Sequence, residues 1–161
     1  MEYDLKLRRK WTFRTQGKQI VLVKKHYEKS VHVLMKGFIW ALYIPHYPNV
    51  TVELGVGDRY KPDVVAIDQQ GMVEFWGEAG QINVEKIHSL LRRYRSTHFA
   101  IAKWRSSLNP LIDVVKAGLE GLKRSSPVDL INFQEKDVER FINEKGNITI
   151  DHHSLDWVRL P

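Results

Sequence analysis

The chain of 161 residues carries a formal net charge of +6, with 43% hydrophobic and 27% charged residues. This balance is that of an ordinary soluble globular protein, and the length suits a single domain over residues 1–161. The absence of cysteine excludes disulfides and thiolate metal sites. We expect neither a secretory signal nor a membrane span, and we place the protein in the cytoplasm.

The first half of the chain predicts a hairpin, a helix and three short strands. Alternation of apolar and polar residues, helical spacing and turn signals identify these elements. They are expected at residues 5–14 and 19–24 for the hairpin, 27–42 for the helix, and 50–54, 62–68 and 72–78 for the strands.

The second half of the chain continues with alternating helices and strands. Asn83 is a good N-cap, and the apolar residues that follow it recur at helical spacing, so a helix begins there. The nearly continuous apolar run over residues 97–102 predicts a buried strand. The remaining elements are expected at residues 111–123 (helix), 128–133 (strand), 135–145 (helix) and 147–151 (final strand).

Without the hairpin and the C-terminal additions, the order is αβββαβ, which predicts a mixed sheet flanked by helices. Asp63 begins the second of the three strands and Glu78 ends the third, with a short turn between them. Two antiparallel neighbours joined by a tight turn place these carboxylates together at one end of the sheet. Paired carboxylates with water are suitable ligands for Mg²⁺. The alternative is a pair of solvated acids at strand ends.

A basic window follows the carboxylate pair. Residues 86–112 contain no acidic residue, and their positive charge equals the net charge of the whole chain. A basic surface beside a candidate active site favours nucleic acid as the partner. The alternative is a solvated helix face. The basic residues are Lys86, Arg92, Arg93, Arg95, Lys103 and Arg105.

Pro62-Asp63 followed by Glu78-Ala79-Gly80 resembles the motif of the PD-(D/E)XK nuclease superfamily. The segment from Trp76 to Gln81 before a basic helix, the segment from His26 to Leu42 and the leading hairpin resemble, more narrowly, the YaeQ family within it. This resemblance covers roughly residues 3–104 and implies a restriction-endonuclease-like fold.

The resemblance also implies a site for Mg²⁺ or Mn²⁺. Asp63 and Glu78 would be metal ligands, and the backbone carbonyl of Ala79 would supply a further oxygen. Glu28 matches an acidic position that many superfamily members use as an additional ligand. The alternative for Glu28 is an acid in the first helical turn, stabilised there by the helix dipole.

The sequence departs from the superfamily pattern at Gly80, where a lysine is usual. Lys86, in the first turn of the next helix, is the best candidate to supply the missing ammonium, and Gln81 could also bind the water or a phosphate oxygen. Lys61 and Lys103 are lesser candidates. The alternative for Lys86 is an ordinary solvent-facing lysine.

These observations lead to a metal-dependent nuclease acting on DNA or RNA as the first hypothesis. The second is a module that kept the nuclease fold without its chemistry and binds nucleic acid or a protein, which the glycine at position 80 motivates. A third is a purely protein-binding factor. The sequence does not indicate the oligomeric state.

Overall fold

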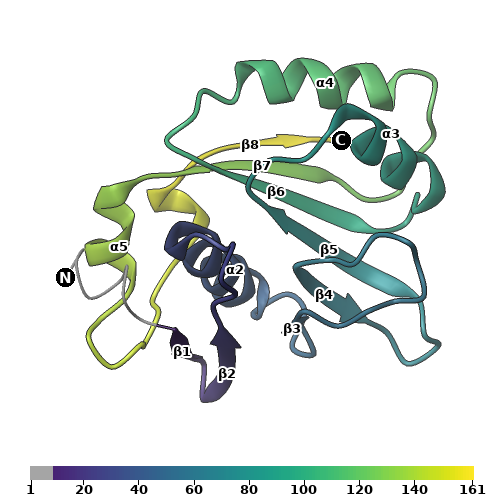
Figure 1. Ribbon diagram of the computed structural model, residues 1–161. Helices are drawn as coiled ribbons and strands as arrows, with labels where there is room; N and C mark the ends of the chain where they lie inside the picture. The colour runs from purple at the N-terminus through teal and green to yellow at the C-terminus, as the bar shows by residue number, and fades with distance from the viewer. Residues whose placement is uncertain (1–8) are drawn as a thin grey trace.

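The structure, a computed structural model, describes residues 9–161 and contains a six-stranded mixed sheet between two layers of helices (Figure 1). The strand order is β3-β4-β5-β6-β7-β8, and β1 and β2 form a separate hairpin. In this part of the chain, no helix is both long and apolar enough to cross a membrane. The elements are β1 (Lys10–Thr15), β2 (Lys18–Val23), α2 (Ser30–Tyr43), β3 (Thr51–Val52), β4 (Val64–Ile67), β5 (Val73–Ala79), α3 (Val84–Arg93), β6 (His98–Trp104), α4 (Asn109–Leu119), β7 (Val128–Phe133), α5 (Glu135–Phe141), the 3₁₀ turn η1 (His152–Ser154) and β8 (Asp156–Leu160).

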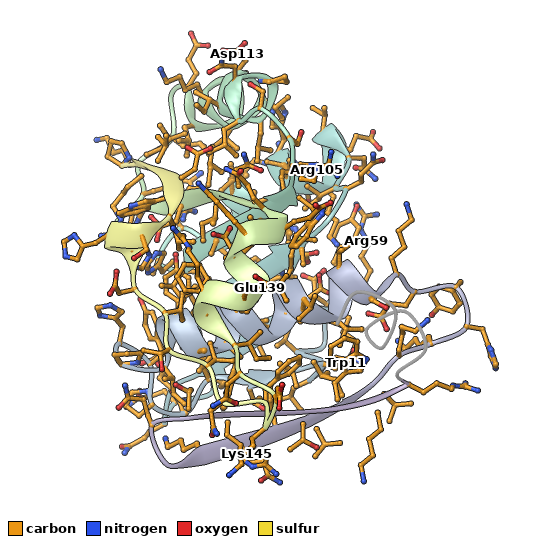
Figure 2. The ribbon with its side chains drawn as sticks, turned by 90° about the vertical axis from the view of Figure 1, so that its left-hand side faces the viewer. Trp11, Arg59, Arg105, Asp113, Glu139 and Lys145 are labelled. Carbon is orange, nitrogen blue, oxygen red and sulfur yellow. The ribbon has the colours of Figure 1, made fainter. Side chains whose placement is uncertain are left out.

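The predicted N-terminal hairpin is confirmed for the described residues, and the part of its first strand before residue 9 lies outside them. Trp11 and Phe13 point from β1 toward α2, and each is about 1% exposed (Figure 2). Gly37 of α2 permits this approach, because a Cβ there would stand 2.8 Å from the Phe13 ring. The hairpin therefore covers the side of α2 that the sheet does not reach.

The alternation of side chains along β6 separates the two faces of the sheet. Ala100 and Ala102 belong to the core beneath α2, whereas Phe99 and Ile101 belong to the core beneath α3 and α4. Small residues allow α2 to lie close to the sheet, and large residues fill the space under the other helices. Each fully buried Phe or Ile stabilises the fold by about 1.5–3 kcal/mol.

The topology brings three strand ends to the same end of the sheet. β4 and β5 are antiparallel, so the start of β4 lies beside the end of β5. β5 and β6 are parallel and connected through α3, so their C-terminal ends lie side by side there. Asp63, Glu78 and Trp104 therefore lie at one end of the sheet, as predicted for the two carboxylates.

The C-terminal part of the chain corrects two predictions. The helix expected over 135–145 ends at Phe141, and the strand expected over 147–151 is absent. Its backbone turns instead to the hairpin and to the end of α5: the Ile148 amide donates to the Arg14 carbonyl, and the Thr149 amide to the Phe141 carbonyl. The edge of β7 is occupied by β8, at residues 156–160.

A buried ionic cluster around Asp129 lies at the opposite end of the sheet. The Asp129 carboxylate is fully buried and accepts hydrogen bonds from Tyr43 Oη (2.6 Å) and Arg159 Nε (2.7 Å), and His98 Nε2 lies 2.7 Å away. Burial alone would raise the pKa of Asp129, but these three partners hold that pKa well below its usual range. One carboxylate thus ties α2, β6, β7 and β8 together.

We expect Asp129→Ala to lower the free energy of unfolding by about 3–5 kcal/mol, because it leaves buried donors without their acceptor. Urea denaturation measures this change. The control is Asp113→Ala, an exposed position on α4 (Figure 2), with an expected change within about 0.5 kcal/mol. Equal stability of the two variants would contradict a structural role for Asp129.

Candidate functional site

The two predicted carboxylates lie opposite each other at the end of the sheet where β4 begins and β5 ends. Val64 of β4 pairs with Gly77 of β5, so Asp63, just before β4, stands beside Glu78. Their side chains are 21% and 8% exposed. Two acids brought together at low exposure repel each other, and this repulsion governs the chemistry of the site.

Glu78 points to the α3 side of the sheet, where two donors meet its Oε1 atom. Trp76 Nε1 donates to that oxygen at 2.8 Å, and Lys86 Nζ lies 3.1 Å from it. Burial and the negative charge of Asp63 together raise the pKa of Glu78 to about 7. Glu78 therefore changes charge near neutral pH.

Asp63 is held from the other side of the sheet. Its Oδ2 atom accepts a hydrogen bond from the Ala79 amide at 2.9 Å, and His32 Nε2 lies 3.5 Å away. Burial alone would raise the pKa of Asp63, but the His32 and Ala79 donors bring that pKa below its usual value. The pKa of Glu78 is thus raised and the pKa of Asp63 is lowered. Such opposite shifts in neighbouring acids are typical of functional carboxylate pairs.

Glu28 lies before α2 and not in its first turn, which corrects the predicted position. The helix begins at Ser30, and Glu28 Oε1 accepts a hydrogen bond from the Lys25 amide at 3.2 Å. Its Oε2 atom meets His32 Nδ1 at 2.5 Å and Lys36 Nζ at 2.6 Å. First-turn stabilisation by the helix dipole therefore does not explain Glu28.

His32, Lys36 and Glu53 also belong to the site, although they are not among the predicted site residues. Lys36 is 2% exposed, and its ammonium also contacts Glu53 Oε1 at 2.5 Å. Burial alone would lower the pKa of Lys36, but Glu28 and Glu53 raise it above its usual value. The signal available in the sequence was the spacing of four from Glu28 to His32 to Lys36, which aligns side chains on one side of a helix and the turn before it.

Gly80 has a structural reason to be glycine. Its φ is 90°, a left-handed conformation that a lysine rarely adopts, although a Cβ there would meet only His32 at an ordinary 3.6 Å. The ammonium nearest to Glu78 comes from Lys86 of α3, whose N-cap Asn83 accepts a hydrogen bond from the Lys86 amide at 2.7 Å. Gln81 is exposed in the loop between Gly80 and α3.

A cleft of about 840 Å³ opens beside Asp63, between the start of α2 and the segment after β6. We call it the basic cleft, because its cationic residues outnumber its acidic ones. Glu78 and Lys86 are not among its lining residues and lie behind Asp63 on the α3 side. The lining residues are Lys25, Tyr27, Glu28, Lys29, Val31, His32, Met35, Lys36, Glu53, Lys61, Pro62, Asp63, Ala79, Gly80, Gln81, Lys103, Trp104, Arg105 and Ser106.

The fold divides the basic window that the sequence presents as one. Lys103 and Arg105, at the end of β6, line the basic cleft. Arg92, Arg93 and Arg95 lie at and beyond the C-terminal end of α3, which returns along the sheet away from the cleft. Arg93 is also engaged by an ion pair with Asp58. Two of the five predicted nucleic-acid contacts therefore lie at the site, and three lie at the other end of α3.

The described residues 9–161 contain no group of three or more His, Asp or Glu side chains arranged to hold a metal ion. Asp63 and Glu78 supply two carboxylates, and Ala79 supplies a neighbouring backbone carbonyl. Mg²⁺ is commonly held by one or two carboxylates with several waters, so these groups fit it. A cation held by these groups would also offset the burial and the repulsion that raise the pKa of Glu78. Glu28 would join such a ligand set only by releasing His32 or Lys36.

The fold is similar to that of solved YaeQ proteins. The structure of the YaeQ protein from Pseudomonas syringae has a TM-score of 0.63 and 13% sequence identity, covering 94% of this chain and 92% of that one. The YaeQ protein from Xanthomonas axonopodis pv. citri has a TM-score of 0.57 and 14% identity, covering 94% and 93% of the two chains. Neither the protein-family models nor the curated proteins include a match to the sequence. At these identities the similarity establishes the fold.

We expect Glu78→Gln to stabilise the metal-free protein above neutral pH. When the pKa of a carboxyl is higher in the folded than in the unfolded chain, the folded protein loses stability as the pH rises from the unfolded-state pKa to the folded-state pKa. The rise from 4.5 to about 7 corresponds, at about 1.4 kcal/mol per pKa unit, to a penalty of about 3 kcal/mol for Glu78 above pH 7. Glutamine removes that penalty.

Urea denaturation in EDTA at pH 5 and pH 8 checks this expectation. The variant should exceed the wild type by about 1–3 kcal/mol at pH 8 and by much less at pH 5. Glu139→Gln, an exposed change on α5 (Figure 2), is the control and should show no such difference. A Glu78→Gln protein that is less stable than the wild type at pH 8 would refute the inferred charge repulsion.

Proposed function

We propose that this chain is a YaeQ-type member of the PD-(D/E)XK superfamily, with a restriction-endonuclease-like core, and that it is a divalent-metal-dependent nuclease. The shared fold with YaeQ proteins supports the first part. The order of Pro62-Asp63 and Glu78-Ala79-Gly80 on neighbouring strands supports the superfamily. Hydrolysis of a phosphodiester in DNA or RNA is the reaction that these groups suit best.

One observation carries the proposal: Asp63 and Glu78 repel each other at one end of the sheet. The Lys86 ammonium lies 3.1 Å from Glu78, and the basic cleft opens beside Asp63. Acids with perturbed pKa values beside a cleft are typical of functional sites. The repulsion favours a divalent cation, and the cleft favours a polyanion. A phosphodiester bound next to a metal ion satisfies both.

The metal would be held by Asp63, Glu78 and the Ala79 carbonyl, with waters completing its coordination. When bound, such an ion polarises the phosphodiester and lowers the pKa of a coordinated water. Trp76 fixes the direction of the Glu78 carboxylate, and the Ala79 amide fixes that of Asp63. Both ligands are therefore positioned before metal or substrate arrives.

The side chains of this chain would then orient the water and stabilise the transition state. Lys86, whose ammonium lies 3.1 Å from Glu78, and Gln81, which lines the basic cleft, are the candidates to contact the attacking water or a phosphate oxygen. The water oxygen loses a proton and bonds to phosphorus while one P–O ester bond breaks, and the leaving oxygen takes up a proton. Negative charge grows on the phosphate oxygens during this step, and an ammonium fixed in advance stabilises it without reorganisation.

We expect Asp63→Asn and Glu78→Gln each to reduce Mg²⁺- or Mn²⁺-dependent cleavage by roughly 100-fold or more, because each removes a ligand charge. Gel assays on single- and double-stranded DNA and RNA measure the rates. Asp113→Asn, an exposed change on α4, is the matched control and should cleave like the wild type. Cleavage that survives both ligand substitutions would refute the proposal.

We expect Lys86→Met to lower kcat by roughly 10²- to 10³-fold, which is the usual effect of removing one preorganised donor. Its metal affinity, measured by calorimetry, should not fall, because the change removes a positive charge beside the ligand Glu78. Lys116→Met on the exposed surface of α4 is the control. Unchanged cleavage by Lys86→Met would assign the ammonium a structural role.

Gly80 favours a second candidate, in which the chain binds nucleic acid or a protein without cleaving anything. The usual lysine is missing from that position, and its φ of 90° disfavours any replacement side chain. Calorimetry separates the two candidates. Absence of Mg²⁺ and Mn²⁺ binding, together with salt-sensitive binding of nucleic acid, would favour the binding module.

A further inference from the structure

The basic cleft carries an exposed aromatic side chain that neither the fold nor the proposed chemistry explains. Tyr27 lies in the segment before α2, lines the cleft and is 84% exposed. Trp104, at the end of β6, lines the cleft as well and is partly buried against the core. Both aromatic residues therefore offer at least part of a ring to the same space.

Cationic residues flank each of these aromatic side chains in the sequence. Lys25 and Lys29 lie on either side of Tyr27, and Lys103 and Arg105 on either side of Trp104. All of them line the cleft. Aromatic and cationic side chains therefore line the same cleft, as in sites where bases stack on aromatic side chains and cations bind the adjoining phosphates.

Most of this positive charge is not used within the described chain. Over residues 9–161, the ammonium groups of Lys25, Lys29, Lys61 and Lys103 form no ion pair with an acidic side chain. Lys36 is different, because Glu28 and Glu53 neutralise it. The free charges are therefore available to an anionic ligand at the cleft.

The backbone at the cleft is also strained. Glu53 and Arg105 line it with φ values of 54° and 48°, in the left-handed region that side-chain-bearing residues seldom adopt. Such conformations gather at ligand-binding sites, where the surrounding structure maintains them. Arg105 lines the cleft together with Lys29 and Val31, at the start of α2.

We propose that the basic cleft binds single-stranded nucleic acid, with one base stacked on Tyr27 and the neighbouring phosphates held by Lys25, Lys29 and Lys103. This inference rests on the proposed function for the location of the scissile phosphate, next to Asp63, and adds the class of substrate. A double helix keeps its bases stacked inside and offers only grooves and backbone to Tyr27. The volume of about 840 Å³ is in the range of small-ligand pockets, which suits one or two unstacked nucleotides.

Fluorescence anisotropy in EDTA tests the proposal without cleavage. The probes are a fluorescein-labelled 12-nucleotide single-stranded DNA, an RNA of the same sequence, and a hairpin duplex DNA containing it. The wild type should bind at least one single strand more tightly than the duplex. Tyr27→Ala should weaken that binding by roughly 5- to 150-fold, the effect of losing one stacked base, and should leave duplex binding unchanged.

Two further variants make the result specific to stacking. Tyr27→Phe keeps the ring and should retain the affinity of the wild type. Met72→Ala removes another apolar side chain, 65% exposed in the turn between β4 and β5, and should have no effect. Because Tyr27 is exposed, its replacement leaves the core intact, which circular dichroism verifies.

The outcomes separate this inference from the proposed nuclease activity. Single-strand binding that does not depend on Tyr27, tighter binding to the duplex, or no binding to any probe would overturn the inference, whether or not the protein cleaves. Tyr27-dependent binding without Mg²⁺- or Mn²⁺-dependent cleavage would support the inference and refute the nuclease. Tyr27-dependent binding with cleavage of single strands would support both.

Discussion

The repulsion between Asp63 and Glu78 is the constraint on which the candidate site depends. The pairing of β4 with β5 brings the two acids together, and a shift of either strand by one residue would exchange the side chains that face its two cores. The sheet therefore enforces a contact that the carboxylates alone would avoid. Trp76 and Lys86 compensate Glu78, and His32 and the Ala79 amide compensate Asp63.

The compensation is incomplete, and this distinguishes the site from the other buried acid of the sheet. Asp129 is fully buried and receives donors on both oxygens, which keep its pKa low and make it a structural anchor. At the other end of the sheet, the pKa of Glu78 is raised to about 7, and Asp63 lines a cleft. A closed, saturated cluster contributes to stability, whereas an open, strained pair can bind a ligand.

The charged residues at this end of the sheet are divided between its two faces. Glu78 and Lys86 lie on the α3 side, and Asp63, His32 and Glu28 lie on the α2 side. Lys36 and its two glutamates form an ion-paired group in the wall of the cleft, with one negative charge in excess. Four lysines without an ion pair in the described chain, Lys25, Lys29, Lys61 and Lys103, line the same cleft as Asp63.

Much of the fold was predictable because its signals are local. The hairpin, the central helix, the three short strands and the N-cap at Asn83 all depend on neighbouring residues, and all are present. The final strand was not predictable: residues 147–151 alternate as a strand should, but their amides bind the hairpin and α5. Competition between two segments for the edge of β7 is decided by packing, which no local pattern encodes.

The candidate site divides in the same way. The sequence by itself determined that Asp63 and Glu78 lie opposite each other, because a short turn between antiparallel strands leaves few alternatives. Only the tertiary structure decided which charges join them. It brought His32 to Asp63 and Lys36 to Glu53, left Tyr27 exposed at the cleft, and sent Arg92, Arg93 and Arg95 to the far end of α3. These contacts join elements distant in the chain, and their geometry follows from how helices pack on the sheet.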